Sequence, residues 1–171
     1  MARELESRGC SVGGMIAPEV RKGGRRVAFK IADIASGREG FLAVTDPRLL
    51  GLRGLSGPRF GRYVIVEGDV ERVGVRALLD ALAKADVIVI DEIGPMELFS
   101  RSLEEAIIKS LKSSKPVVSV FHRRLSKTHP HIYRLLESSG CMAWVDEASR
   151  RLIADIVGEI ADAISSKASC G

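Results

Sequence analysis

The 171-residue sequence contains no asparagine and no glutamine, and its arginines greatly outnumber its lysines. Side-chain amides are thermolabile, and their depletion recurs in proteins adapted to heat. The composition therefore suggests a thermophilic source. It does not by itself favour any class of activity.

Cysteines are also few and widely spaced. The three of them, Cys10, Cys141 and Cys170, form no C-x-x-C pair. Structural zinc sites and thioredoxin-like motifs need such close pairs. The spacing argues against both.

Long apolar runs are absent as well. No window reaches the roughly 18 uncharged apolar residues that a membrane-spanning helix needs. The first eight residues, MARELESR, lack the apolar core of a secretory signal. We therefore expect no membrane partner and a cytoplasmic location.

Aromatic residues make up only 5% of the chain, and the net charge is a modest +4 with its basic residues scattered. A nucleic-acid-binding surface combines a basic face with stacking aromatic side chains. Nucleic acid is therefore an unlikely partner by composition. RNA binding stays a weaker alternative, which a strong salt-dependent affinity for RNA would revive.

What the chain does contain is the balance of a globular protein, with 46% hydrophobic and 28% charged residues. Its length suits one domain covering residues 1–171. Strand-like patterns predict strands at 12–20, 26–34, 63–66, 87–90, 116–121 and 141–145. Helical patterns predict helices at 2–8, 69–85, 130–139, up to Leu111 and up to about Ser166.

The connections between these elements carry further predictions. Lys22-Gly23-Gly24 predicts a hairpin turn, and the Gly- and Pro-rich stretch 36–61 predicts a long loop. Ser100 or Ser102 is expected to cap the helix ending at Leu111, since Ser102 and Glu105 have capping-box spacing.

The alternation of strands and helices in the second half predicts right-handed parallel crossovers. We therefore expect an α/β fold, a mostly parallel doubly wound sheet with helices on both faces and an N-terminal β-hairpin.

The segment with the clearest chemistry is VIVIDEIGPMELFS, residues 87–100. Four apolar β-formers end in Asp91 and Glu92, which places two carboxylates at the carboxyl end of a buried strand, where open α/β sheets bind ligands. Many strands end in acidic residues, so a structural interpretation stays open. Glu97 is a third acid, either a charge favouring the next helix or part of a site.

This segment resembles the signature of the nucleoside-triphosphatase family of the cancer-related NTPase type, which are P-loop ATPases and GTPases. GMIAPEVR (14–21) with GRRVAF (24–29) is similar to the family's hairpin, GRYV (61–64) to a later strand, and PVVSVFH (116–122) to the strand after the signature helix. Met15 and Ala28 replace the family's usual Phe and Gly. The resemblance spans nearly the whole chain.

The resemblance implies a P-loop NTPase-like (RecA-like) fold and Mg²⁺-dependent hydrolysis of ATP, GTP and other nucleoside triphosphates to the diphosphate and phosphate. Asp91 would hold the Mg²⁺ shell, Glu92 would orient or deprotonate the attacking water, and Glu97 would be a supporting acid. Ile93 and Gly94, next in the signature, would line the nucleotide site. Arg26 and His122 are further candidates for contact with the phosphates, each with a plain structural alternative.

One departure from the family is large. Its members begin with a strand and a G-x-x-x-x-G-K-[ST] loop leading into a helix, and this sequence contains no such loop. Residues 2–8 read as the tail of that helix, so we expect about 20 residues to be missing upstream. The missing strand is expected beside the strand bearing Asp91, so residues 87–90 would either expose an unpaired side or accept a wrong partner.

The loop matters for binding. Its charge-assisted hydrogen bonds contribute about 1.5–3 kcal/mol each, whereas micromolar affinity amounts to about 8 kcal/mol in all. This chain alone is therefore expected to bind and hydrolyse nucleotide poorly. Two alternatives stay open: a kinase-like phosphotransferase acting on a nucleoside or nucleotide, and a catalytically inactive scaffold.

Overall fold

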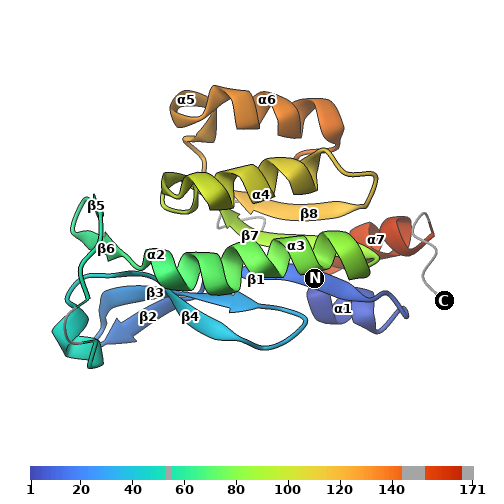
Figure 1. The fold of residues 1–171 in the computed structure, drawn as a ribbon. Coiled ribbons are helices and arrows are strands. Elements are labelled where there is room, and N and C mark those ends of the chain that lie inside the picture. The colour runs from blue at the N-terminus through green and yellow to red at the C-terminus, as the bar shows by residue number, and fades with distance from the viewer. Residues whose placement is uncertain (53–54, 144–152, 167–171) are drawn as a thin grey trace.

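The computed structural model describes residues 1–52, 55–143 and 153–166. Its centre is an eight-stranded sheet with helices on both faces (Figure 1). The strands are β1 (Val12–Ile16), β2 (Glu19–Lys22), β3 (Arg25–Asp33), β4 (Glu39–Val44), β5 (Arg59–Phe60), β6 (Tyr63–Ile65), β7 (Val87–Ile93) and β8 (Val117–Phe121). The helices are α1 (Ala2–Glu6), η1 (Pro47–Leu50), α2 (Glu67–Asp69), η2 (Val70–Val75), α3 (Arg76–Lys84), η3 (Glu97–Phe99), α4 (Arg101–Leu111), α5 (Leu125–Thr128), α6 (Pro130–Ser139) and α7 (Ile153–Ser165).

The sheet is mixed rather than mostly parallel. Its order is β5-β6-β4-β3-β1-β7-β8, with β2 paired to β3. Only β1–β7 and β7–β8 are parallel pairs, and the other described pairs are antiparallel. The predicted α/β class and N-terminal hairpin are present. The parallel prediction holds for β1, β7 and β8, and of these β7 and β8 follow one another through the helical crossover of α4.

Of the two outcomes expected for β7, the unpaired side is wrong. β7 lies between β1 and β8, with Val89 opposite Gly14 on one side and Val118 on the other. Its continuous apolar run fits this central place, because Val87, Ile88, Val89 and Ile90 are all buried. Among the described strands, the free edge on this side of the sheet belongs to β8.

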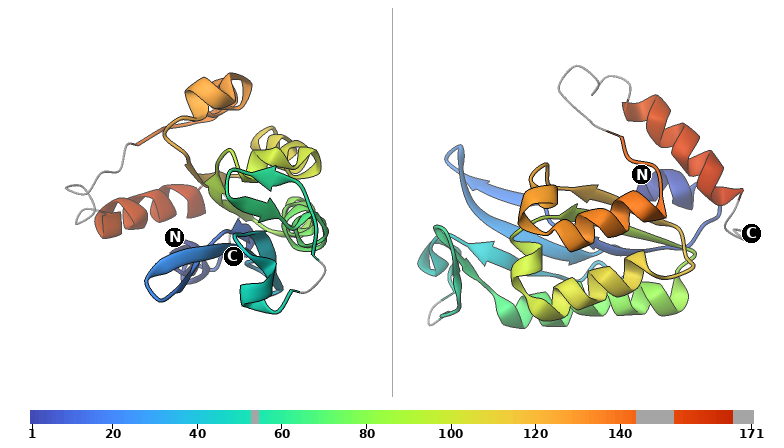
Figure 2. Two further views of the ribbon diagram at one scale, coloured as in Figure 1. Left: turned by 90° about the vertical axis from the view of Figure 1, so that its left-hand side faces the viewer. Right: turned by 90° about the horizontal axis from the view of Figure 1, so that it is seen from above.

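Two separate layers of side chains cover the faces of the sheet. On one face, Ile88 and Ile90 pack with Leu78 of α3 and Ile107 of α4. On the other, alternate residues such as Val87 pack with residues from α1 and α7, namely Leu5, Ala161 and Ile164. Figure 2 shows α1 and α7 on the opposite side of the strands from α3 and α4. Helices thus cover both faces, as predicted.

The segment 36–61 is not one long loop. It contains β4, η1 and β5. Leu42, Ala43 and Val44 are fully buried because β4 pairs with both β3 and β6. The surrounding glycines and prolines concealed this short apolar run from a composition-based interpretation.

Two consecutive glycines let β1 approach its neighbours. A Cβ at Gly13 would lie 2.7 Å from the Cβ of Ala81 in α3, and one at Gly14 would lie 2.0 Å from the carbonyl oxygen of Val89. Gly14 also has a φ of +121°, which L side chains rarely adopt. The pair therefore serves close packing of β1 against α3 and β7.

Several predicted termini are confirmed and others are corrected. Ser100 caps α4, since its hydroxyl accepts from the Leu103 N–H. The capping box of Ser102 and Glu105 is wrong, because the helix already begins at Arg101. The predicted strand 141–145 is absent at 141–143, and its remainder lies outside the described residues.

None of the described helices has the length and apolarity needed to cross a membrane.

Candidate active site at the carboxyl edge of the sheet

Asp91 and Glu92 lie near the carboxyl end of β7. Asp91 stands opposite Ile16 of β1 and Val120 of β8. The Asp91–Glu92 peptide bond is cis. The register with β8 shifts between Asp91 and Ile93, so Glu92 has no partner residue in that ladder. Such irregularities re-aim side chains next to active sites.

The Asp91 carboxylate lies on an open part of the sheet. Residues in register point to the same face, and the two that flank Asp91, Ile16 and Val120, are 37% and 55% exposed. Asp91 makes no ion pair with any other described residue. Its backbone oxygen accepts from the Ala17 N–H at 2.6 Å, which ties the two strand ends together. The carboxylate is thus presented to incoming ligands.

Burial raises the pKa of both acids. For Asp91 desolvation is the cause, because the protein around this exposed strand end still removes part of the water that would stabilise the charged carboxylate. For Glu92 desolvation is the largest cause and the Asp91 charge adds to it, while His122 lowers the pKa. Raised carboxyl pKa values bring a candidate general base closer to neutral pH.

His122 follows β8 and lies at the same edge. Its backbone N–H donates to the Ile93 carbonyl at 3.0 Å, and its Nδ1 accepts from the Arg124 N–H at 3.2 Å. Nδ1 is thereby engaged with a backbone donor, and Nε2 is the other ring nitrogen that could meet a ligand. His122 thus lies at the same edge as Glu92, near enough to influence the pKa of Glu92.

Glu97 and Gly94 complete this group. Glu97 begins the short helix η3 and is only 6% exposed. Burial is the first cause that raises the pKa of Glu97, to about 7. Gly94 and Ile93 are buried between the acids, and the Gly94 carbonyl accepts from the Leu98 N–H at 3.0 Å. Five predicted positions thus lie close to Glu92 along the chain or at the same edge: Asp91, Ile93, Gly94, Glu97 and His122.

Arg26 is not part of this group. Ala32 of β3 stands level with Ile16 and hence with Asp91, whereas Arg26 lies six residues farther along β3, roughly 20 Å of strand. Its guanidinium pairs with Glu19 at 2.6 Å and lies 5.1 Å from the centre of the Phe29 ring. The hairpin of β2 and β3 holds this arginine beyond the edge, apart from the acids.

The donor set suits a hard cation bound together with phosphate. No group of three or more His, Cys, Asp or Glu side chains that could hold a metal occurs within 1–52, 55–143 and 153–166. Mg²⁺ is usually held by one or two carboxylates, water and substrate phosphates rather than by a full protein cage. Asp91, with Glu92 beside it, fits that mode of binding.

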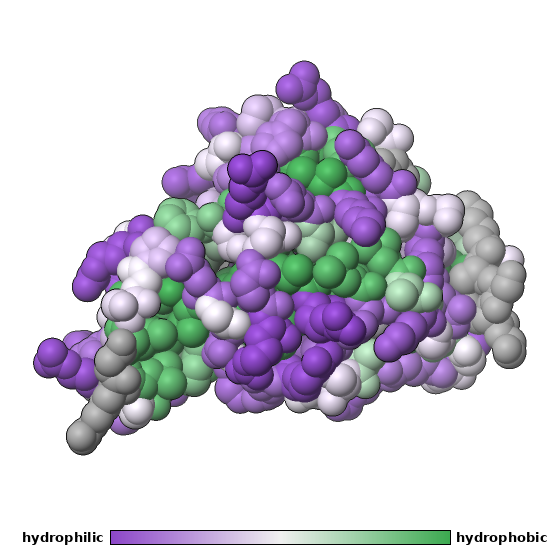
Figure 3. Space-filling view, viewed as in Figure 1, coloured by the Kyte–Doolittle hydropathy of each residue, from purple (hydrophilic) through white to green (hydrophobic). Residues whose placement is uncertain are grey.

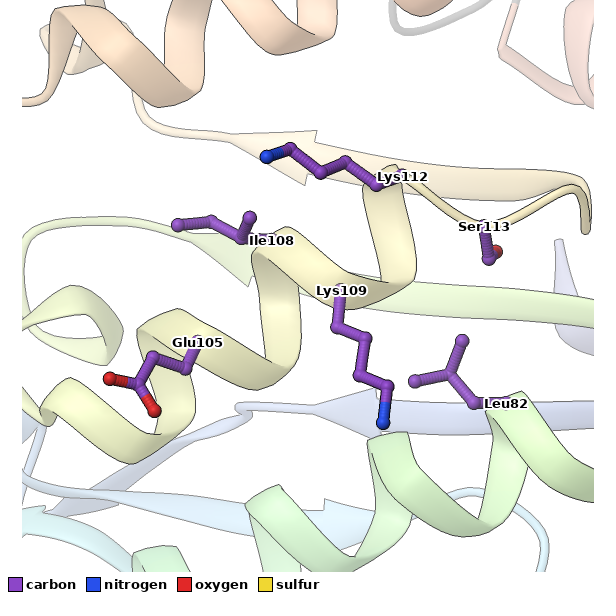
Figure 4. Close-up of a pocket in the computed structure, with 6 residues that line it drawn as sticks. All are labelled: Leu82, Glu105, Ile108, Lys109, Lys112 and Ser113. Atoms are coloured by element: carbon purple, nitrogen blue, oxygen red, sulfur yellow. The ribbon is translucent and has the colours of Figure 1, made fainter.

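A surface hollow of the described structure lies elsewhere. It sits between α3 and α4, has a volume of about 520 Å³ and is lined by Leu82, Glu105, Ile108, Lys109, Lys112 and Ser113 (Figure 4). Hydrophobic surface follows the line between these helices (Figure 3). None of the predicted site residues lines the hollow. The site prediction therefore depends on the sheet edge and not on this groove.

Sequence reasoning missed the way Gly94 brings two acids together. A Cβ at this position would lie 2.8 Å from Glu97 Oε2 and 3.1 Å from Glu92 Oε1. A glycine spaced two residues after one acid and three before another was the available signal. Only the fold of the loop shows that both side chains turn toward it.

Comparison with known proteins identifies relatives of the whole described fold. The family model for NTPase matches residues 1–158. The nucleoside-triphosphatase THEP1 of Thermofilum pendens is 50% identical over 127 residues, and that of Thermococcus kodakarensis is 48% identical over 124. The crystal structure of THEP1 from the hyperthermophile Aquifex aeolicus superimposes with a TM-score of 0.71 at 21% identity, covering 92% of this chain and 88% of that one.

The sequence matches cover 74% and 72% of this chain, but only 66% and 67% of the two relatives. The chain thus spans about two thirds of the length of these curated relatives. The structural similarity confirms the α/β fold class. The match along residues 1–158 confirms the resemblance drawn from the signature segment, and the chain belongs to the NTPase family.

Proposed function

We propose that this protein hydrolyses nucleoside triphosphates, ATP and GTP among them, to the diphosphate and phosphate with Mg²⁺ as cofactor. The observation that carries the proposal is the exposed Asp91 carboxylate at the carboxyl edge, which forms no ion pair with a described residue, with Glu92 beside it. The printed names of the relatives, nucleoside-triphosphatases, support the reaction class. A cytoplasmic location remains our prediction.

Each acid has a distinct role in this proposal. Asp91 holds Mg²⁺ through its carboxylate or a bound water, and the ion, when bound, neutralises charge on the phosphate oxygens. Glu92 orients the attacking water and accepts its proton. The raised pKa of Glu92 supports this role, because a base near the working pH transfers protons efficiently.

In this proposal His122 contacts the phosphates, whereas Arg26 does not in the conformation seen. His122 lies near Glu92, and its Nδ1 accepts from the Arg124 N–H, so Nε2 is the ring nitrogen that suits a contact to the γ-phosphate. Ile93 and Gly94, which are buried next to Glu92 in the chain, line the nucleotide site in this proposal. Arg26 would reach the phosphates only if the hairpin of β2 and β3 bent toward the edge.

The test is Mg²⁺-dependent phosphate release from ATP and GTP without an acceptor, for this chain and for a version extended upstream in the same reading frame. Glu92→Gln should lower kcat by at least roughly 100-fold, the scale of removing a general base. Glu137→Gln, an exposed acid in α6, is the matched control and should not change kcat. If Glu92→Gln leaves the rate of phosphate release unchanged, the proposal is contradicted. Phosphoryl transfer that occurs only with an added acceptor favours the phosphotransferase alternative.

A further inference from the structure

The hollow between α3 and α4 combines apolar surface with lysine side chains. Leu82 of α3 and Ile108 of α4 supply apolar surface, and the Lys109 side chain reaches from α4 toward α3 (Figure 4). Leu79, one turn before Leu82, is 38% exposed and extends the apolar surface along α3. Contiguous apolar surface with a polar rim is typical of sites that contact another molecule.

A second hollow continues the first on the other side of α4. It lies between α4 and α6, has a volume of about 430 Å³, and shares Ile108 and Lys112 with the first. Lys109, Lys112 and Arg134 at these rims form no ion pair with any residue that the structure describes. Glu105, the acid that lines the first hollow, already forms an ion pair within α4 at 2.9 Å. The two hollows therefore present excess positive charge beside apolar surface.

The helix α7 carries the opposite charge. Its sequence, IADIVGEIADAIS, contains acidic residues and no lysine, arginine or histidine. Ala161 is buried against the sheet, whereas Ile160 is 36% exposed and its neighbour Glu159 is exposed. Glu159 forms no ion pair with a described residue, in contrast to Asp162, which pairs with Arg8 at 2.6 Å. The outer side of α7 thus offers an apolar side chain next to a carboxylate.

These two surfaces lie on opposite faces of the sheet. Figure 2 shows α7 on one side of the strands and α3 and α4 on the other. A molecule therefore cannot place its own α7 in its own hollow, and it can offer both surfaces to other copies at once. A contact between unlike patches of identical molecules is heterologous, and it builds a closed ring or an open chain.

We propose that α7 of one copy of this chain docks in the hollow between α3 and α4 of the next copy. Ile160 enters the apolar hollow, and Glu159 faces Lys109 and Lys112 at the rim. Interfaces commonly combine an apolar centre with a polar rim, and rim charges set approach and register more than affinity. The inference is independent of the proposed function, because neither surface includes a residue of the candidate site.

The first experiment is sedimentation equilibrium of the full chain over a dilution series, at about 0.1 M and about 1 M salt. We expect an average mass above that of the monomer at low salt, increasing with protein concentration. The mass should fall at high salt, because the Debye length shortens from about 10 Å to about 3 Å and screens the ion pairs. A chain that stays monomeric at every concentration at low salt overturns the inference.

Two variants test the α7 side of the contact. Ile160→Glu would place a charge in the apolar hollow and should weaken association by at least roughly 30-fold, the scale of a central interface residue. Glu159→Lys changes only an exposed side chain, so it tests the contact even if Ile160→Glu disturbs α7. It should also weaken association, because it brings a cation to the lysines. Phe99→Glu, at a 44% exposed position outside both surfaces, is the control and should have no effect. Association that none of the three changes would mean that another surface is used.

The hollow is tested by reversing its charge in the double variant Lys109→Glu/Lys112→Glu. This variant should associate at least roughly tenfold more weakly than the parent chain, whereas Lys127→Glu, at an exposed position of α5, should not. Circular dichroism checks that each variant is folded. Equal association of the double variant and the parent chain contradicts a role for the hollow.

Mixing the two kinds of variant decides between this contact and any other. The double lysine variant keeps a working α7, and Ile160→Glu keeps a working hollow, so one intact contact forms between them. We expect each variant alone to be monomeric and the mixture to form a 1:1 dimer that does not grow further. A mixture that stays monomeric overturns the inference.

Discussion

Glu97 should make the stability of the folded chain depend on pH. Its pKa is raised from 4.5 to about 7 by burial in the folded state. A raised carboxyl pKa means that the folded state binds the proton more tightly than the unfolded state. The stabilising contribution is therefore complete below about pH 4.5 and is lost as the pH rises through about 7.

Glu97→Gln should remove this dependence. Between pH 5 and 8 the parent chain is expected to lose up to about 3 kcal/mol through Glu97, whereas the variant has no such group to ionise. Urea unfolding at several pH values measures both free energies of unfolding. Glu137→Gln on the exposed side of α6 serves as the control. Parallel pH profiles for parent and Glu97→Gln would contradict the burial of a protonated acid.

Gly14 is a second residue that affects stability, because a side chain at this position would destabilise the fold. Its φ of +121° and the 2.0 Å approach of the Val89 carbonyl leave no room for a Cβ. Gly14→Ala should lower the free energy of unfolding by about 1–3 kcal/mol from backbone strain, with the steric clash added. Gly23→Ala has a positive φ but open space, so it isolates strain from clash. Equal losses for both in urea unfolding would show that β1 and β7 can move apart.

At the scale of elements, the beginning of α4 depends on one hydroxyl group. The Ser100 side chain accepts from the Leu103 N–H and satisfies one of the free donors of the first turn. Ser100→Ala should cost about 1 kcal/mol of stability. Ser126→Ala, at an exposed position of α5, should cost much less. Thermal unfolding measures the Tm of both variants. Equal Tm values would contradict a stabilising cap at Ser100.

The local pattern predicted some elements well and others poorly. The helix 130–139 matches α6 in full, because its apolar stripe and the proline at its start are local signals. The prediction for 36–61 failed, because β4 owes its formation to pairing with β3 and β6. A strand of six residues needs its partners, and composition alone does not reveal them.

At the scale of the whole molecule, the two ends of the described chain meet on one face of the sheet. Leu5 of α1 is fully buried and packs in one cluster with Ala161 of α7. Arg8 Nε lies 2.6 Å from Asp162 Oδ1 on the surface of the same contact. The apolar part, and not the exposed ion pair, should hold α1 and α7 against the sheet.

Leu5→Ala should therefore lower the free energy of unfolding by about 2–5 kcal/mol, since it opens a cavity between a helix pair and the sheet. Glu6→Ala, exposed on the same helix, is the matched control and should cost far less. Urea unfolding measures both. A small loss for Leu5→Ala would indicate that this layer contributes little to the fold.

The sequence by itself determined the α/β class, the buried run of β7 and the acids that follow it, because hydrophobic periodicity and strand ends are local properties. It also pointed to the family through motifs at fixed spacing. The tertiary structure decided which strands flank β7, that Arg26 stands apart from the acids, and that Glu92 and Glu97 converge on Gly94. These outcomes depend on pairing and burial between segments distant along the chain, and no local pattern encodes the distance between two side chains that only folding brings together.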